Sequence, residues 1–142
     1  VLLIDVLKGT VAVLVGSFYL QNNMELAAIG MAAVVGHVYP IYYRFHGGKG
    51  VATALGVFYG LNIFLGLFCT VVWLIMLKMF RFSSLSSLTM VSIAPFAAIV
   101  FLNSTFSAVP LLLIAILVAR QHHENIDRLI KKSEPHTTLF SK

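Results

Sequence analysis

The chain has 142 residues, of which 59% are hydrophobic and 11% are charged, and its formal net charge is +5 at pH 7. Its mean hydropathy is +0.93, whereas an average soluble domain has about 25% charged residues. This composition argues against a soluble enzyme and indicates a protein whose solvent is a lipid bilayer. The basic residues are scattered in ones and twos between apolar runs. They indicate anchoring near anionic headgroups, and not the continuous basic face of a nucleic-acid-binding protein.

Six apolar segments predict an all-α fold, a polytopic integral membrane helix bundle with about six transmembrane helices. A helix needs about 20 apolar residues to cross the hydrocarbon core, so the third segment would be a short crossing. Polar turns, a Gly-rich loop and a Ser-rich entry separate the segments. In chain order, the segments are residues 1–20, 26–43, 51–61, 64–80, 88–102 and 107–120.

The polar tail, residues 120–142, is expected to lie on the cytoplasmic side of the membrane. Its Ile126, Leu129 and Ile130 stand among charged residues, which suits a short amphipathic helix on the inner surface; a solvated tail is the alternative. If the loop at 44–50 is cytoplasmic, alternating crossings place all ten Lys and Arg residues at or near that side. This is the distribution that the positive-inside rule expects.

The start of the sequence and its cysteine content lead to further expectations. The sequence begins with Val1, without Met and inside an apolar run, from which we expect an internal or C-terminal piece of a longer protein. We expect residues 1–142 to form a single membrane domain. Cys69 is the one cysteine and lies in an apolar run, which excludes a disulfide framework or a cysteine-based metal site within the chain.

The strongest chemical signal is the loop that precedes the segment at 51–61. It contains Gly47, Gly48, Lys49 and Gly50. Glycines let successive backbone N–H groups converge on an anion, and the start of a helix adds positive potential to the charge of the lysine. The loop is therefore a candidate phosphate site, although its spacing is not that of a Walker A loop. The alternative is a flexible turn with a snorkelling lysine.

A second candidate site for an oxyanion combines Arg81 with Ser84 and Ser87. The two serines are three residues apart, so they share a face if a helix begins there. Hydroxyl and N–H groups at a helix start, with an arginine one turn before them, suit a bound oxyanion. The alternative is a serine N-cap beside an arginine that anchors the chain at the membrane interface.

The third candidate is the run of His122, Asn125 and Arg128, at three-residue spacing in the tail. Histidine can hydrogen-bond or transfer a proton, and arginine can bind phosphate. One alternative is an ordinary solvated helix. Another is the pair of His122 and Asp127, whose H-x-x-x-x-D spacing is that of soluble acyltransferases in which a carboxylate orients a catalytic histidine. No zinc site is expected, because the neighbouring His and Glu residues do not share a helix face.

Asp5 and Lys8 form an ionisable pair near the inner end of the first segment. Ionisable groups within a membrane span are costly and are usually paired or functional, and a spacing of three residues allows an ion pair on a helix. Plain snorkelling at the end of the span is the alternative.

The loop and the tail together resemble a known family. Residues 36–40 (GHVYP) and 45–53 (FHGGKGVAT) closely resemble the second motif of the bacterial acyl-phosphate-dependent glycerol-3-phosphate acyltransferases, the PlsY family. Residues 122–129 (HHENIDRL), with Glu134, resemble the third motif, and residues 5–9 and 81–87 look like two further family segments. The family's first motif, rich in Ser, Gly and Asn, is absent because the sequence begins after it, and Lys132 stands where the third motif usually has Gly.

The resemblance implies a reaction and a location. An acyl phosphate donates its acyl group to the sn-1 hydroxyl of glycerol 3-phosphate, giving lysophosphatidate and phosphate in the first acylation step of phospholipid biosynthesis. The expected enzyme is a multi-pass protein of the bacterial cytoplasmic (inner) membrane, with its active site and C-terminus facing the cytoplasm. Its expected partners are the two substrates and membrane lipid, with no cofactor, no metal and no nucleic acid.

With this reaction, the three candidate sites receive roles. The Gly47–Gly50 loop would hold one phosphate, and Arg81, Ser84, Ser87 and Arg128 would help to hold the other. His122, Asn125 and His37 are the expected catalytic residues. A substrate phosphate oxygen could take the hydroxyl proton; if a protein base acts, it is His122 or His37. Two alternatives stay open: a membrane carrier for a phosphorylated anion, and a non-catalytic membrane subunit that docks a partner through its tail.

Overall fold

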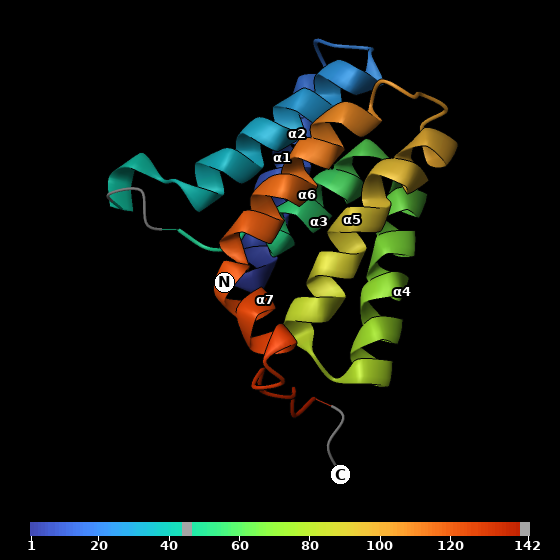
Figure 1. Cartoon of the computed structure of the whole chain (residues 1–142). Helices are drawn as coiled ribbons and strands as arrows, with labels where there is room; N and C mark the ends of the chain where they lie inside the picture. Colours follow the sequence, from blue (N-terminus) through green and yellow to red (C-terminus); the bar gives the residue numbers. More distant parts are fainter. Residues whose placement is uncertain (44–46, 140–142) are drawn as a thin grey trace.

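The structure, a computed structural model, describes residues 1–43 and 47–139, and all regular secondary structure in this part of the chain is helical (Figure 1). The N-terminus lies near α7, and the described part of the tail continues from α7 at the same end of the bundle. The elements are α1 (Leu2–Ser17), α2 (Asn23–Val38), the 3-10 helix η1 (Ile41–Tyr43), α3 (Val51–Leu61), α4 (Ile63–Phe80), α5 (Ser83–Phe101), α6 (Ala108–Gln121) and α7 (His123–Ile130).

Local chemistry explains where several helices begin and end. Asn22 caps α2 and Asn62 caps α4, because each side-chain oxygen accepts a hydrogen bond from a backbone N–H in the first turn, at 2.8 Å in both helices. Gly50 precedes α3 with a φ of 90°, a conformation that glycine adopts without steric cost. Arg81 ends α4 with a φ of 62°, and this left-handed turn lets α5 begin two residues later.

The bundle is built around α3. This helix packs against α1, α2 and α4 and, less extensively, against α5. α6 closes the bundle against α2 and α5, while α4 packs along α5. Fully buried side chains come from every long helix, with Val13 on α1, Val34 on α2, Phe58 on α3, Leu65 on α4, Met90 on α5 and Ile114 on α6 among them. The apolar core therefore connects all the long helices into one unit.

The contact between α1 and α3 depends on two glycines. A Cβ on Gly9 would overlap the carbonyl oxygen of Thr53, and a Cβ on Gly56 would overlap the carbonyl oxygen of Val6. The backbones of α1 and α3 therefore touch, as at other helix crossings where small residues replace large ones. The hydroxyl of Thr10 donates a hydrogen bond to the carbonyl oxygen of Gly56, 2.9 Å away.

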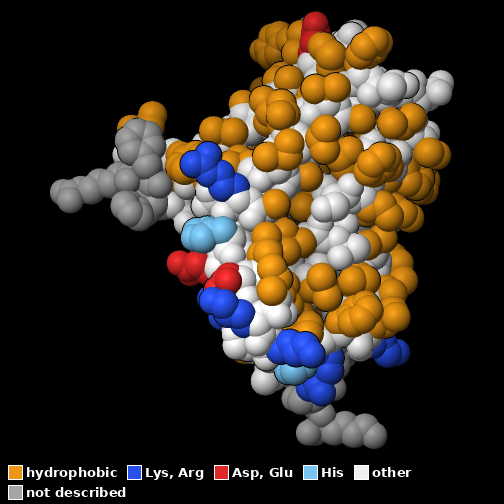
Figure 2. All heavy atoms as spheres, in the orientation of Figure 1, with side chains coloured by type: hydrophobic (Ala, Val, Ile, Leu, Met, Phe, Trp, Pro, Cys, Tyr) orange, Lys and Arg blue, Asp and Glu red, His pale blue; other side chains and the backbone are white. Residues whose placement is uncertain are grey.

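Hydrophobic side chains cover most of the face shown in Figure 2, and Lys and Arg side chains gather on its lower part, toward α7. Many large apolar side chains of α1, α4, α5 and α6 are exposed. α4 and α5 are each long and apolar enough to cross a membrane, with mean hydropathies of 2.3 and 1.8, whereas α2, α3 and α6 are shorter apolar helices. The expected count of six crossings is therefore not confirmed by helix length.

The helical fold that we expected is confirmed, with two differences in the boundaries. The expected segment 88–102 corresponds to α5, which begins at Ser83, so the Ser-rich stretch is its first turn and not an entry loop. The expected segment 26–43 ends earlier, since α2 stops at Val38 and η1 follows. The amphipathic helix expected in the tail is present as α7. Arg44, Phe45 and His46 of the second motif lie outside the described residues.

Candidate active site

One cavity, of about 770 Å³, lies among helix ends at the α7 side of the bundle. The starts of α1, α3 and α5 and the ends of α2 and α6 contribute to its wall, together with the tail after α7. Its apolar lining comes from α1, α3, α4 and α5 and from Pro135 of the tail. The polar and glycine lining residues are Asp5, His37, Gly48, Lys49, Gly50, Thr70, Ser83, Ser84, Ser87, His122, Asn125, Glu134, His136 and Thr137.

The Gly-rich loop brings a lysine to the start of α3. The first N–H groups of α3 have no partner within the helix and carry its positive dipole end, and Lys49 adds a full charge two residues before the helix. The ammonium group of Lys49 donates a hydrogen bond to the side-chain oxygen of Asn125. Gly48 lies against the ring of His37, where a Cβ would approach Nε2 within 2.5 Å. A side chain at position 48 would therefore force the His37 ring or the loop to shift.

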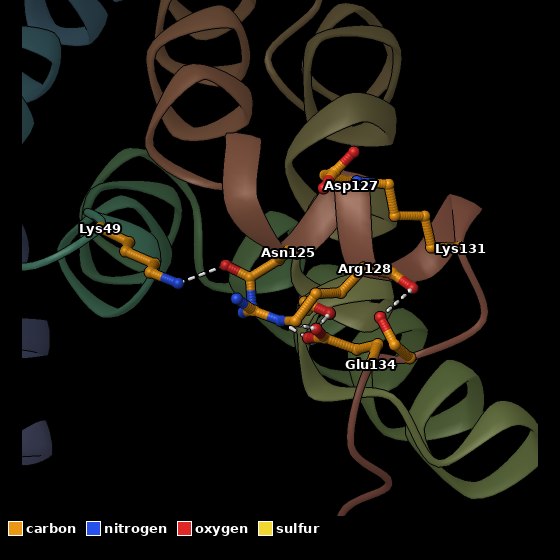
Figure 3. A network of polar contacts seen from close by, with 8 residues as sticks. Lys49, Asn125, Asp127, Arg128, Lys131 and Glu134 are labelled. Carbon is orange, nitrogen blue, oxygen red and sulfur yellow. Dashed lines mark hydrogen bonds and ion pairs between the residues drawn. The ribbon is translucent and has the colours of Figure 1, made fainter.

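Glu134 joins α5, α7 and the tail (Figure 3). Its Oε1 accepts hydrogen bonds from the Ser84 hydroxyl at 2.7 Å and from the Asn125 amide nitrogen at 2.9 Å, and its Oε2 accepts one from Arg128 Nε at 2.7 Å. Because the amide nitrogen of Asn125 bonds to a carboxylate, its oxygen is directed to Lys49. The chain Glu134–Asn125–Lys49 thus fixes the position of the lysine in the cavity.

The carboxylate of Glu134 is ionised at all ordinary pH values. Burial alone would raise its pKa, but the hydrogen bonds from Asn125, Ser84 and Arg128 and the charge of Arg128 outweigh burial and lower the pKa to about 2. The side chain is only 6% exposed. A buried carboxylate with three donors is a stable anchor for the groups that it holds.

Burial favours the neutral form of His122. It is 4% exposed, and its pKa is lowered by burial and by the charge of Lys49, against the opposing effects of the Val118 carbonyl and Glu134. The ring Nδ1 lies 2.8 Å from the carbonyl oxygen of Val118. Since a carbonyl can only accept, Nδ1 carries the proton, and Nε2 keeps a lone pair. A neutral imidazole of this tautomer can accept a proton or a hydrogen bond through Nε2.

The carboxylate of Asp5 lies beside a lysine and a histidine. Its Oδ1 lies 3.0 Å from Lys8 Nζ and 3.6 Å from His37 Nδ1. The Asp5–Lys8 pair is therefore confirmed as a contact, and the carboxylate also faces the histidine that lies against Gly48. Lys8 does not line the cavity, whereas Asp5 and His37 do.

Eight of the eleven predicted site residues line the cavity, and they come from four segments of the chain. Gly47, Arg81 and Arg128 are not among the lining residues. Arg128 acts on the site through Glu134. Within the described residues, the Nε of Arg81 is buried without a hydrogen-bond partner, and its carbonyl oxygen accepts from the N–H of Thr137 at 2.6 Å.

Ser87 lines the cavity with its hydroxyl already engaged. Its Oγ lies 2.9 Å from the carbonyl oxygen of Ser83 and accepts a hydrogen bond from Trp73 Nε1 at 3.0 Å. Because the hydroxyl proton goes to the carbonyl, Ser87 has no proton to donate to a bound phosphate. Ser84 likewise donates to Glu134, so a phosphate beside it would have to share that proton.

Sequence reasoning missed the central position of Glu134, which it recorded only as part of a motif. The partners of Glu134 lie 6, 9 and 50 residues away in the sequence, so no local spacing could indicate them. The residues after Glu134, which reach the cavity as Pro135, His136 and Thr137, were also missed. Asp127, the partner in the alternative acid–histidine pattern, instead pairs with Lys131 at 2.9 Å and is 59% exposed.

Comparison with known proteins identifies relatives over nearly the whole chain. A family profile described as glycerol-3-phosphate acyltransferase matches residues 1–132. A glycerol-3-phosphate acyltransferase of Coxiella burnetii is 42% identical over 139 residues, which are 98% of this chain and 72% of the relative. One of Legionella pneumophila is 37% identical over 135 residues, and this chain spans about half of its length, 49%.

Solved structures of an integral membrane protein give the same result. The crystal structure of PlsY (YgiH), an integral membrane glycerol 3-phosphate acyltransferase, in its glycerol 3-phosphate form has a TM-score of 0.87 and 36% sequence identity, covering 97% of this chain and 70% of that one. The lysophosphatidic acid form of PlsY has a TM-score of 0.83 and 37% identity, covering 95% and 69%. The all-helical fold, the membrane character and the motifs therefore agree with one family.

Proposed function

Since the chain belongs to the glycerol-3-phosphate acyltransferase family, we propose that it catalyses transfer of an acyl group from acyl phosphate to the sn-1 hydroxyl of glycerol 3-phosphate. The products are lysophosphatidate and inorganic phosphate. The observation that carries this proposal is the cavity that Lys49, His122, Asn125 and Ser84 all line. An acyltransferase that joins two phosphorylated substrates needs cationic and donor groups at one polar end and room for a hydrocarbon chain.

The proposed chemistry rests on positioning and on charge stabilisation. The sn-1 hydroxyl oxygen attacks the acyl carbonyl carbon, the bond from that carbon to the phosphate oxygen breaks, and phosphate leaves with the electron pair. Phosphate is a good leaving group in a mixed anhydride, so no activated protein nucleophile is required. The hydroxyl proton passes to a substrate phosphate oxygen or to the lone pair on His122 Nε2; His37 is the second candidate base.

The binding roles divide between the two sides of the cavity. In this proposal, Lys49 and the backbone N–H groups of the Gly47–Gly50 loop hold one phosphate. His122, Asn125 and Ser84 hold the other or the departing phosphate, and Arg128 supports them through Glu134. Arg81 and Ser87 support phosphate binding at the start of α5. Ser87 does so by holding the Trp73 side chain through its hydrogen bond. The apolar part of the cavity, with Val6 and Leu55, accommodates the acyl chain.

We also propose a location and a topology for the chain. It lies in the bacterial inner membrane as a single domain, residues 1–142, which crosses the bilayer six times, with α3 as a short crossing. The cavity, α7 and the tail face the cytoplasm. The positions of Lys and Arg support this orientation, because the connections at 18–22, 62 and 102–107 contain neither residue.

Turnover of purified full-length parent protein tests the proposed function. Glycerol 3-phosphate is supplied with palmitoyl phosphate or with palmitoyl-CoA, and phosphate release and lysophosphatidate formation are followed. We expect product from the acyl phosphate only. Product from the CoA ester only would contradict the proposed donor. Uptake of glycerol 3-phosphate into vesicles without any acylated product would favour the carrier.

A further inference from the structure

The apolar part of the cavity extends along three helices. The lining residues farthest from the polar ends of these helices are Leu55 on α3, Thr70 on α4 and Met90 on α5. Thr70 lies ten residues before the end of α4 at Phe80, which is about 15 Å along the helix axis. The next turn of α3 beyond Leu55 carries Tyr59, which is not among the lining residues.

Tyr59 fills the space between α3 and α4 directly beyond these lining residues. Its hydroxyl lies 2.7 Å from the hydroxyl oxygen of Thr70, and the Thr70 hydroxyl lies 2.9 Å from the carbonyl oxygen of Gly66. Because the carbonyl can only accept, Thr70 donates to Gly66 and Tyr59 donates to Thr70. The aromatic ring lies against Gly66, where a Cβ would overlap ring atoms. Hydrogen bonding at one end and packing on a glycine thus hold the ring in place.

We propose that Tyr59, held by Thr70, determines the length of acyl chain that the cavity accepts. The inference rests on the proposed function and goes beyond it, because it assigns a residue to substrate selection. A chain that extends along α4 from Leu74 past Trp73 meets the Tyr59 ring beside Thr70. Further methylene groups must then either displace the ring or leave the cavity between helices. A single methylene in an apolar pocket changes specificity by about 10-fold or more.

Chain-length profiles of purified full-length variants test this proposal. The kcat/KM is measured for acyl phosphates from decanoyl to arachidoyl, with glycerol 3-phosphate saturating. Tyr59→Ala removes the ring and should raise the ratio of stearoyl to myristoyl transfer about 10-fold. Tyr59→Phe keeps the ring and loses only the hydrogen bond, so its profile should stay close to wild type. Thr70→Leu adds apolar bulk at the same level and should shift the profile toward shorter chains.

Phe64→Ala is the matched control, because Phe64 is an aromatic residue on α4 that is 63% exposed and outside the cavity lining. Its profile should equal that of the wild type. If Tyr59→Ala or Thr70→Leu elutes as a folded protein with an unchanged profile, the acyl chain leaves the cavity between helices and the proposal is overturned. If one of the two does not fold, the other still decides. If the wild type transfers no acyl group, the proposed function fails, and this result is distinct from an unchanged profile.

Discussion

The α1–α3 crossing and the cluster around Glu134 are both close contacts between separate segments, but they differ in what makes the contact. At the crossing, backbone touches backbone, because Gly9 and Gly56 have no side chains. At the cluster, a carboxylate accepts three hydrogen bonds from side chains of α5 and α7. The first contact forms because the two glycines lack side chains, and the second forms because ionised and polar side chains bond to one another. The crossing is therefore sensitive to size, and the cluster is sensitive to charge.

Gly56→Leu should have the largest effect, and it should act on folding. The added side chain would overlap the carbonyl of Val6, and overpacking of this kind costs about 3 kcal/mol or more when backbone must move. We expect little folded protein by fluorescence-detected size exclusion in detergent. Gly36→Ala is the control, since a Cβ at Gly36 meets nothing within 4 Å. Normal elution and melting of Gly56→Leu would contradict the backbone contact.

Lys49→Ala should have the largest effect on activity without affecting insertion. The ammonium group is the single full charge that the Gly-rich loop brings to the cavity, and loss of one such stabilising donor lowers kcat by about 100-fold or more. Activity is measured by phosphate release, and insertion by membrane extraction. Lys78→Ala serves as the control, because Lys78 is exposed in the last turn of α4 and is not among the cavity-lining residues. Near wild-type turnover of Lys49→Ala would remove this lysine from the phosphate site.

Glu134→Gln should lower activity by about 10-fold. The substitution keeps the shape of the side chain but removes the negative charge that pairs with Arg128. The new glutamine amide also places an N–H donor where the carboxylate had only acceptor oxygens. Charge-assisted hydrogen bonds contribute about twice as much as neutral ones, so Asn125 and Lys49 should lose their fixed positions. The loss should appear in kcat/KM for glycerol 3-phosphate. A lower melting temperature with unchanged kcat/KM would instead show that Glu134 has a purely structural role.

The pH dependence of stability separates Glu134 from His122. The lowered pKa of Glu134 stabilises the fold above about pH 4.5, and this contribution is lost only as the pH falls toward about 2. The pKa of His122 is also lowered, from 6.5, so below pH 6.5 the unfolded chain takes up a proton first and stability falls. Between pH 7 and 5, melting temperature should decrease in the wild type and in Glu134→Gln. It should decrease less in His122→Gln, and an identical slope would contradict the neutral buried imidazole.

Arg128→Ala should have the smallest effect, about threefold on kcat/KM. Its side chain is 39% exposed and does not line the cavity, and partly exposed ion pairs contribute about 1 kcal/mol or less. Ser84 and Asn125 would still hold Glu134. A loss as large as that of Lys49→Ala would indicate that Arg128 contacts substrate directly.

Much of the fold could be predicted because apolar runs and polar turns have local signals. The segment expected at 51–61 coincides with α3, which a glycine and an asparagine delimit. The start of α5 was missed because its serines are polar. In the structure, Ser86 and Ser87 donate to the carbonyls four residues before them, which satisfies their hydroxyls inside a helix. A hydropathy profile counts these serines as polar whether or not their hydroxyls are hydrogen-bonded within the helix, so it does not reveal where α5 begins.

The Gly-rich loop of the candidate site could be predicted from the sequence, whereas the hydrogen bonds that hold Lys49 in place could not. The glycines and Lys49 indicate a candidate anion site by their own chemistry, and Gly48, Lys49 and Gly50 line the cavity. The hydrogen bonds of Glu134 join residues up to 50 positions apart, so they follow from tertiary packing alone. For the same reason, spacing could not reveal that Ser87 is bonded to Trp73 or that Tyr59 lies beyond the end of the cavity.

A crystal structure of the full-length parent protein with glycerol 3-phosphate bound would test the central claim most directly. We expect the substrate phosphate inside the cavity, within hydrogen-bonding distance of Lys49 Nζ or of His122, Asn125 and Ser84. The sn-1 hydroxyl should face the apolar part of the cavity, where the acyl carbonyl arrives. A phosphate bound only by exposed residues outside the cavity, such as Lys78 or Arg120, would contradict the assignment of this cavity as the active site.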